Sequence, residues 1–303
     1  MMAALQTRPL RGTLLMNEPM ARHTTWRVGG LAERYYQPAD IADLAQFLQQ
    51  LPPEESLYWI GLGSNLLVRD GGILGTVIAT SGLLNDIKRL DANRVRVESG
   101  VSCAKVARFC AREGLAGAEF LSGIPGTMGG ALAMNAGCFG GETWRLVETV
   151  ETLDHQGLLH KRQASEYEVA YRHVSGPADE WFVAAYLKLD GGDARELQAR
   201  NKELLERRSS SQPTQLPNAG SVFRNPEGDY AARLIETAGL KGRCIGGACV
   251  SEKHANFIVN TGNARAADIE ALIELVQQEV GQVHGVKLKP EVHIIGEREE
   301  VQA

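Results

Sequence analysis

Glycine is concentrated in two short segments of this 303-residue chain, and these segments restrict the folds that the chain can adopt. The denser segment, from Ser122 to Gly130, contains five glycine or proline residues among nine, and Asn135 follows it. Such a backbone is unusually free at its glycines and unusually rigid at its proline. The serine, the threonine and the nearby asparagine can also form hydrogen bonds. An ordinary loop rarely needs this density.

The second segment runs from Gly61 to Asn65 and follows an apolar run, Tyr58 to Ile60, that we expect to be a strand. Glycine lets the backbone approach a pyrophosphate closely, and successive amides can donate hydrogen bonds to it. The segment lacks the third glycine of the Rossmann fingerprint and does not lead into a clear helix, so alone it is equally well explained by a turn. Two such segments in one domain predict a long, phosphate-bearing cofactor between two subdomains.

Composition excludes several classes of protein. The formal net charge of -5 argues against general nucleic-acid binding. No apolar run is long enough to cross a bilayer. The histidines are scattered without a metal-binding spacing, so we expect no metal site. The cysteines form no Cys-x-x-Cys pair, and we expect free thiols in a reducing compartment, at Cys103, Cys110, Cys138, Cys244 and Cys249.

The length suits two or three domains, and short strands and helices are expected throughout. We expect a loose N-terminal tail over residues 1–20, a first subdomain over 21–86 and a second over 87–208. The clearest linker, Ser209 to Pro213, then opens a C-terminal α+β domain over 209–303. Within the second subdomain, the runs from Val147 to Leu153 and from Leu158 to Arg162 are typical of a β-hairpin.

Two further elements are expected near the ends of the chain. Asp40 can cap a helix whose apolar face includes Ile41, Leu44 and Leu48. Residues 287–295 are expected to form a terminal strand, interrupted by Pro290.

Three further segments carry polar residues of possible chemical use. They are Tyr171-Arg172, the stretch from Gly220 to Pro226, and Pro290-Glu291-Val292. Taken singly, each has an ordinary explanation: a surface arginine, a serine in a turn, and an exposed glutamate beside a proline.

Taken together, these motifs resemble those of the UDP-N-acetylenolpyruvoylglucosamine reductases, flavoproteins of peptidoglycan precursor synthesis. The matching segments occur in the family's order from about residue 20 to 296, so the resemblance covers nearly the whole chain. They are Thr25–Gly30, Gly61–Leu67, Gly123–Gly130, Asn135–Gly137, Tyr171–Arg172, Ala219–Pro226, His254–Asn260 and Pro290–Val292.

The resemblance implies an α+β fold, with a two-subdomain FAD-binding part of the vanillyl-alcohol-oxidase (PCMH) type and a C-terminal substrate-binding domain. Arg172 and Ser221 are 49 positions apart (221 minus 172), which implies the shorter subclass, without the insertion that carries a tyrosine. FAD would be bound without a covalent link by the glycine segments, at Gly61, Gly63, Ser64, Asn65, Ser122, Gly123, Ile124, Pro125, Gly126, Thr127, Gly129, Gly130 and Asn135.

The resemblance also implies a reaction in two halves. NADPH would reduce FAD, which would then reduce UDP-N-acetylglucosamine enolpyruvate to UDP-N-acetylmuramate in the cytoplasm. Arg172, Ser221 and Glu291 would be catalytic. Apart from the resemblance, we expect a monomer, with no membrane or nucleic-acid partner. The substrate contacts would be made by Tyr171, Arg224 and Asn225.

One departure from the family concerns the support of Arg172. The family often has serine two places after this arginine, where this chain has Val174. Two other functions remain open at this stage. One is an alcohol or hydroxy-acid oxidase on the same scaffold, and the other is a nucleotide-sugar sensor that has lost catalysis.

Overall fold

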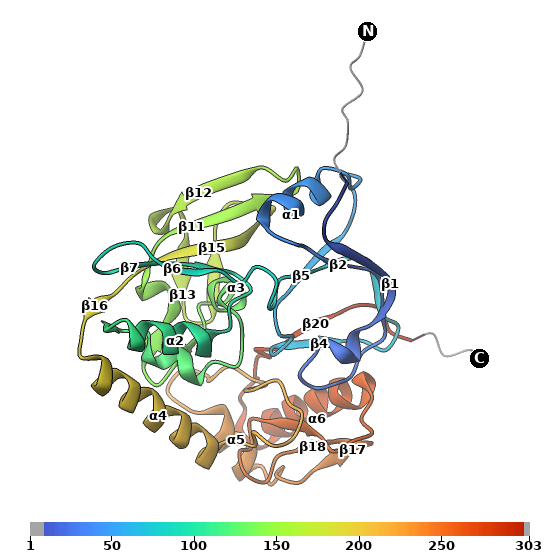
Figure 1. Ribbon diagram of the computed structural model, residues 1–303. Helices are drawn as coiled ribbons and strands as arrows, with labels where there is room; N and C mark the ends of the chain where they lie inside the picture. The colour runs from blue at the N-terminus through green and yellow to red at the C-terminus, as the bar shows by residue number, and fades with distance from the viewer. Residues whose placement is uncertain (1–8, 300–303) are drawn as a thin grey trace.

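The computed structural model describes residues 9–299, and within that range no helix is long and apolar enough to span a membrane. The first subdomain is a four-stranded sheet in the order β1-β2-β5-β3 (Figure 1). β1 and β2 are antiparallel, whereas β2, β5 and β3 run parallel to one another. The elements are β1 (Thr13–Pro19), η1 (Met20–Arg22), β2 (Leu31–Gln37), α1 (Ile41–Leu48), β3 (Leu57–Ile60), β4 (Leu66–Val68) and β5 (Ile73–Ala79).

Two predictions about this subdomain have different outcomes. The helix predicted after Asp40 is confirmed, because the Asp40 carboxylate accepts a hydrogen bond from the amide of Asp43 and caps α1. The loose tail predicted over residues 1–20 is wrong for residues 13–19, which form β1 and pair with β2. Residues 1–8 lie outside the described range.

The second subdomain is a five-stranded antiparallel sheet in the order β12-β11-β15-β7-β6. The predicted hairpin is confirmed as β11 paired with β12. Helices α2 and α4 pack together at this subdomain, where the Asn201 amide donates to the carbonyl of Ala107 at 3.1 Å. The sheet and its helices are β6 (Ile87–Arg89), β7 (Arg94–Glu98), α2 (Cys103–Arg112), α3 (Met128–Ala133), β11 (Val147–Asp154), β12 (Leu159–Gln163), β15 (Glu180–Lys188) and α4 (Ala194–Ser211).

Short elements complete this part of the chain. Three two-stranded pairs lie outside the main sheet, β16 with β8, β10 with β9, and β13 with β14. Their bounds, with those of the 3-10 helices, are β8 (Leu115–Ala116), η2 (Glu119–Gly123), β9 (Gly137–Cys138), β10 (Gly141–Glu142), η3 (Thr143–Arg145), η4 (Ala164–Glu166), β13 (Glu168–Ala170), β14 (His173–Ser175) and β16 (Asp190–Gly191).

The linker predicted at Ser209 is partly wrong, because α4 continues through Ser211. The hydroxyls of Ser209 and Ser211 donate hydrogen bonds to backbone carbonyls three or four residues earlier in the helix. Serine can form this bond without leaving the helical conformation, so the serine run does not end α4. The chain leaves the helix only at Gln212, before Pro213.

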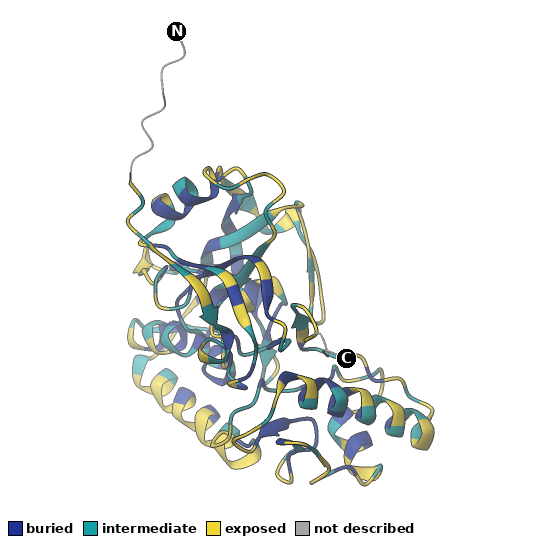
Figure 2. Ribbon diagram, turned by 90° about the vertical axis from the view of Figure 1, so that its right-hand side faces the viewer, coloured by how far each residue is buried: buried dark blue, intermediate teal, exposed yellow. Residues whose placement is uncertain are grey.

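The C-terminal domain is a small antiparallel sheet, β17-β18-β19, covered by helices. Figure 2 shows the exposed residues on the outer faces of the helices and buried residues toward the interior. The terminal strand predicted over residues 287–295 is shorter than expected. The elements are α5 (Ala231–Thr237), β17 (Cys244–Ile245), β18 (Ala248–Val250), β19 (Ile258–Asn260), α6 (Ala266–His284) and β20 (His293–Ile295).

The C-terminal domain is joined closely to the first subdomain. Trp26 and Leu67 are fully buried in its hydrophobic core. The indole of Trp26 donates to the carbonyl of Ile258 at 2.8 Å, and the Asn260 amide donates to the carbonyl of Trp26 at 2.9 Å. β20 pairs in parallel with β4, although more than two hundred residues separate them. These contacts fix the last strand against the loop that follows β3.

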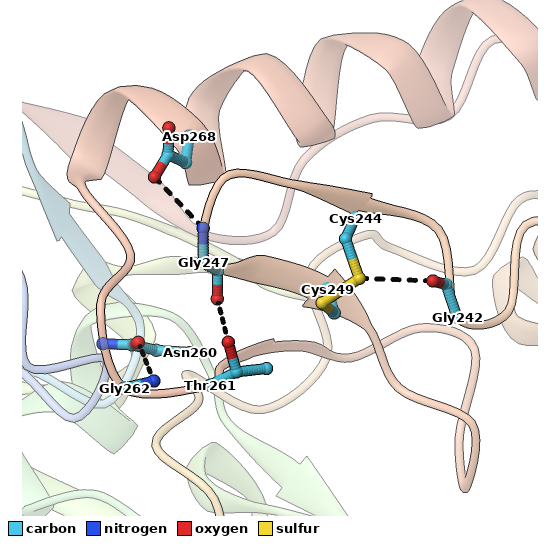
Figure 3. Close-up of a disulfide and its surroundings, with 8 residues drawn as sticks. All are labelled: Gly242, Cys244, Gly247, Cys249, Asn260, Thr261, Gly262 and Asp268. Carbon is cyan, nitrogen blue, oxygen red and sulfur yellow. Dashed lines mark hydrogen bonds between the residues drawn. A yellow bond between two sulfur atoms is a disulfide. The ribbon is translucent and has the colours of Figure 1, made fainter.

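The expectation of five free thiols is wrong for two of the cysteines. Cys244 and Cys249 form a disulfide, and they are direct partners in the β17–β18 hairpin (Figure 3). The separation of five positions between the two cysteines does not by itself predict a disulfide. The bond depends on a tight turn that places Cys244 and Cys249 opposite each other. Cys103 and Cys110 are free, and burial raises the pKa of each to about 12.

The disulfide predicts a thiol count. Unfolding the protein without reductant, in the presence of a thiol-specific chromogenic reagent, should reveal three thiols per chain, and prior reduction should raise the count to five. The double variant Cys244→Ser/Cys249→Ser is the control and should give three thiols under both conditions. Five thiols without reductant would show that the hairpin cysteines are unpaired.

Candidate active site

The two glycine segments line one cavity of about 410 Å³ between the subdomains. They approach each other closely at one point, since a Cβ added at Gly61 would lie 2.3 Å from the Thr127 hydroxyl. The predicted cofactor residues that line this cavity are Gly61, Gly63, Ser64, Asn65, Ile124, Gly126, Thr127 and Gly130. This arrangement brings together two segments that the sequence predicted to share one ligand.

The two walls of this cavity differ in their hydrogen bonding. On the wall formed by Ser122–Gly130, the carbonyl of Gly126 accepts a hydrogen bond from the backbone amide of Cys103, and the amide of Gly129 donates to the carbonyl of Ser99. These two bonds anchor the loop. On the wall formed by Gly61–Asn65, the backbone amides of Ser64 and Asn65 have no acceptor among residues 9–299. Adjacent unbound amides beside a glycine are suitable donors for phosphate oxygens. The residues present therefore fit the diphosphate of FAD.

Three predicted cofactor residues have other surroundings. The hydroxyl of Ser122 donates to the carbonyl of Glu119 at 2.7 Å and lines none of the cavities described here. Asn135 is buried and donates to the carbonyl of Ala170 at 3.1 Å, so it supports the β13–β14 turn instead. At Gly129 an added Cβ would lie 2.9 Å from the Cβ of Ser99, so this glycine is required for close packing.

A second cavity of about 240 Å³ adjoins the first and shares Ser64, Asn65 and Ile124 with it. Arg172, Ser221 and Glu291 all line it. They come from the β13–β14 turn, from the loop after the linker, and from the segment before β20. Gly123 and Pro125 of the glycine segment complete its wall. The structure thus brings together the three residues that the sequence analysis selected, beside the predicted flavin site.

Arg172 is held firmly for a long side chain. It occupies the second position of a two-residue turn with φ at +54°, a conformation that favours glycine. Its guanidinium donates to the carbonyls of Asn135 at 3.3 Å and Gly137 at 2.8 Å. These carbonyls supply the support that Val174 cannot give. Only 17% of the Arg172 side chain is exposed, so few of its rotamers remain accessible.

Glu291 faces Arg172 across the second cavity, and Arg172 Nε lies 2.9 Å from Glu291 Oε1. The N–H does not point at the oxygen well enough to form an aligned hydrogen bond, so the contact is an ion pair. Burial raises the pKa of Glu291, and the charges of Arg172 and Arg224 oppose this only in part. The side-chain amide of Asn65 donates to the backbone carbonyl of Glu291 at 3.1 Å, which ties Glu291 to the first glycine segment.

Ser221 lies in a loop that is fixed on its C-terminal side. Asn256 accepts a hydrogen bond from the amide of Val222 through its carbonyl and another from Phe223 through its side chain, both at 2.9 Å. Gly220 precedes the serine with φ at +73°, a conformation that glycine adopts without cost. The Ser221 hydroxyl has no protein partner among the described residues and is available to a ligand.

The three predicted substrate contacts lie outside this cavity wall. Tyr171 is 48% exposed, and its ring packs against the guanidinium of Arg172. The Asn225 side chain accepts from the amide of Ala231 at 3.1 Å, so its oxygen supports the start of α5. Arg224 is near enough to Glu291 to influence its pKa, and its Nε is buried without a partner in the described chain.

The sequence analysis missed several residues that line the second cavity, including Cys138, Arg208, Gln212 and Phe257. Arg208 lies in the last turn of α4, just before the predicted linker, and Gln212 follows the helix within that linker. The only local signal was an arginine a few residues before Gln212-Pro213. That pattern does not distinguish a surface helix end from a cavity wall.

Comparison with known proteins places these observations in a family. Residues 32–162 match a model described as FAD binding domain, and residues 212–295 match the UDP-N-acetylenolpyruvoylglucosamine reductase, C-terminal domain. A UDP-N-acetylenolpyruvoylglucosamine reductase of Alkalilimnicola ehrlichii is 61% identical over 98% of this chain and 99% of its own length. The chain belongs to the UDP-N-acetylenolpyruvoylglucosamine reductase family. The family resemblance seen in the sequence is confirmed.

Other relatives agree with this assignment. A reductase of the same name from Methylococcus capsulatus is 60% identical over 97% of each chain. The crystal structure of the UDP-N-acetylenolpyruvylglucosamine reductase from Thermus caldophilus has a TM-score of 0.81 and 34% identity, covering 94% of this chain and 98% of that one. The predicted fold class, a two-part FAD-binding unit followed by this family's C-terminal domain, is also confirmed.

The cofactor cavity of this reductase predicts different effects at two of its glycines. Gly126→Val should fold, because the atom nearest to a Cβ added at Gly126 is Ser64 Oγ, at 3.4 Å. It should retain less FAD, because the valine methyl groups extend into the space between the two glycine segments. Gly129→Val should instead lower the melting temperature, because Ser99 occupies the required space. Flavin absorbance per protein and thermal melting measure the two effects separately.

The matched control for both glycines is Gly191→Val, at an exposed position where an added Cβ meets nothing within 4 Å. It should retain FAD and melt close to the wild type. Acid should release intact FAD from the wild type, although Cys138 lies in the adjoining cavity. Full FAD retention by Gly126→Val would mean that the phosphates bind elsewhere.

Glu291 predicts a pH-dependent stability. Its pKa is raised in the folded protein, so its stabilising contribution is complete at acidic pH and is lost as the pH rises through the folded pKa. Glu291→Gln cannot ionise, and its melting temperature relative to wild type should therefore increase with pH. Melting curves between pH 4 and pH 9 test this, with exposed Glu227→Gln as control. A difference independent of pH would mean that the Glu291 pKa is unchanged on folding.

Proposed function

We propose that this chain reduces UDP-N-acetylglucosamine enolpyruvate to UDP-N-acetylmuramate, with NADPH as reductant, in cytoplasmic peptidoglycan precursor synthesis. The observation that carries the proposal is the cavity where Arg172, Ser221 and Glu291 meet beside the glycine segments. FAD held between the glycine segments would supply the hydride-transfer chemistry, from NADPH to the terminal carbon of the enolpyruvyl group. The name shared by the relatives favours this reaction over an oxidase or a silent sensor.

Arg172 binds the carboxylate of the enolpyruvyl group. Hydride addition leaves negative charge on the carbon next to the carboxylate, and this charge spreads into the carboxylate as an enolate. A guanidinium is permanently cationic, and its planar donors match two carboxylate oxygens. Arg172 is already fixed by two backbone carbonyls, so it stabilises the developing charge without having to reorganise.

Ser221 donates the proton that completes the reduction. A hydroxyl without help is a weak acid at neutral pH, but the acceptor here is a strongly basic carbon. The Ser221 hydroxyl forms no bond within the described chain that would have to be broken first. Its loop is fixed through Asn256, so the proton is delivered from one direction.

Glu291 assists at the other side of the substrate carboxylate. Burial raises the pKa of Glu291, so when the substrate carboxylate binds beside Arg172 the Glu291 carboxyl can take up a proton. It then donates a hydrogen bond that polarises the substrate carboxylate, or supplies that proton to the site. We place the reaction in the cytoplasm, where NADPH and nucleotide sugars are both available. We also infer a monomer, because one chain supplies all three side chains and both glycine segments.

Separate measurement of the two half-reactions tests the role of Ser221. Ser221→Ala should bind FAD normally and be reduced by NADPH at close to the wild-type rate. Its reoxidation by UDP-N-acetylglucosamine enolpyruvate should be slower by about 10²–10⁴-fold, the range typical for loss of a positioned acid. Stopped-flow flavin absorbance under nitrogen follows the two steps one at a time.

Two further variants complete this test. Ser221→Cys keeps a proton donor at nearly the same place and should recover part of the second half-reaction. Ser210→Ala removes an exposed hydroxyl that donates to Arg207 on α4, and it should match the wild type in both halves. If Ser221→Ala slows both half-reactions equally, Ser221 positions the flavin or the domain and is not the acid.

A further inference from the structure

A third cavity, of about 740 Å³, lies between the β17–β18 hairpin and the linker that follows α4. Both cysteines of the Cys244–Cys249 disulfide line it, and Cys244 is exposed. Cys103 and Cys110, by contrast, are buried. The cavity volume is within the range of sites that bind small molecules. A small thiol that enters this cavity can therefore reach the hairpin disulfide but neither buried thiol.

The tip of the hairpin is held by bonds that do not involve the disulfide. The amide of Gly247 donates to the carboxylate of Asp268 at 3.4 Å. The carbonyl of Gly247 accepts from the amide and the hydroxyl of Thr261, at 3.0 Å and 2.9 Å (Figure 3). Opening the S–S bond therefore leaves the hairpin folded, with the two cysteines still opposite each other. The disulfide can form again at the same place, which a reversible modification requires.

The disulfide also lies at one end of a row of residues that crosses the C-terminal sheet toward Ser221. Cys249, the strand partner of Cys244, is also the partner of Val259 on β19. Val259 in turn pairs with Asn218 in the linker. The Asn218 side chain accepts a hydrogen bond at 3.0 Å from the amide two residues later, just before Ser221. The row therefore fixes the N-terminal side of the loop that carries Ser221.

We propose that Cys244 and Cys249 form a redox modification site for a low-molecular-weight thiol–disulfide couple, and that the closed disulfide holds the Ser221 loop in place. The second part rests on the proposed function, which makes Ser221 the proton donor and places the reaction in the cytoplasm. Cytoplasmic thiols are kept reduced, and a disulfide in that compartment is usually transient and responds to the redox state. Two cysteines that face each other at a cavity wall are suited to that response.

Opening and closing the site exchange two electrons with the couple. A small thiolate attacks one hairpin sulfur, forms a mixed disulfide with it and releases the other cysteine as a thiolate, which takes up a proton. A second small thiolate attacks the mixed disulfide at the sulfur of the small molecule, and the first cysteine leaves and is protonated in turn. Two small thiols are thus oxidised to one small disulfide while the hairpin is reduced. Closing the hairpin disulfide is the reverse of these steps.

Equilibration with glutathione tests the modification site without any substrate. The FAD-loaded protein is incubated in buffers with different ratios of glutathione to glutathione disulfide, and its free thiols are trapped by alkylation. Peptide mass spectrometry should show Cys244 and Cys249 changing together and reversibly between disulfide and thiols, while Cys103 and Cys110 remain thiols. A hairpin pair that stays closed, or stays open, in every buffer would overturn the site.

Hydrogen exchange tests the link to the Ser221 loop. The amides of residues 218–223 should exchange about tenfold faster when the disulfide is open, because the constraint at the end of the row is lost. The β11–β12 hairpin is the internal control and should exchange equally in both forms. The double variant Cys244→Ser/Cys249→Ser cannot close the bond and should resemble the open form in oxidising and in reducing buffer. Equal exchange of residues 218–223 in the open and closed wild type would refute the link, whether or not the double variant folds.

The two half-reactions show whether this link affects catalysis. After removal of the small thiols, NADPH should reduce the flavin at the same rate in the open and closed forms. Reoxidation by UDP-N-acetylglucosamine enolpyruvate should be about tenfold slower in the open form, because a proton donor held less firmly spends less time in its reactive position. Equal reoxidation rates in the two forms would overturn the role of the disulfide at Ser221. Reoxidation absent from both forms would count against the proposed function alone, since the glutathione equilibrium and hydrogen exchange test the site separately.

Discussion

Arg172 and Glu291 form a mostly buried ion pair whose partners belong to different parts of the chain, and the catalytic cavity depends on it. Removing both charges from water is costly, and their attraction returns that cost only when the geometry is good. The Arg172–Glu291 contact lacks an aligned hydrogen bond, so the compensation is incomplete. A substrate carboxylate can provide what is missing. The pair is therefore better suited to binding and chemistry than to stabilising the empty protein.

The frame around this pair keeps its two partners in place. Trp26 inserts from the first subdomain into the core of the C-terminal domain, and its indole is satisfied by a backbone carbonyl. The β4–β20 pairing and the bond from Asn65 to Glu291 then fix the acid beside the first glycine segment. Burial of Trp26 contributes several kilocalories per mole, roughly 3–5 on the scale of a tryptophan truncation. The free energy gained by packing Trp26 therefore offsets the cost of burying the Arg172–Glu291 pair.

Sequence reasoning succeeded where the determinant is local or part of a motif. The Asp40 cap, the β11–β12 hairpin, and the meeting of Arg172, Ser221 and Glu291 were all expected. It failed where the determinant is a pairing or a local bond that the residue pattern does not show. The β1 strand depends on its pairing with β2, and the end of α4 depends on serine hydroxyls that donate back to helix carbonyls. The Cys244–Cys249 disulfide depends on a tight turn that places the two cysteines opposite each other. Arg208 was missed because an arginine at a helix end is usually solvated, and only the tertiary arrangement places it on the cavity wall.

The left-handed conformation of Arg172 links stability to function. It costs about 1–2 kcal/mol relative to an ordinary backbone, and glycine at this position would avoid that cost. The left-handed backbone sets where the side chain leaves the main chain, toward the catalytic cavity. A glycine would relieve the strain but remove the guanidinium. Such strain persists only where the surrounding structure fixes the conformation, and the carbonyls of Asn135 and Gly137 hold the Arg172 guanidinium. The turn therefore places a fixed cation where the proposed substrate brings negative charge.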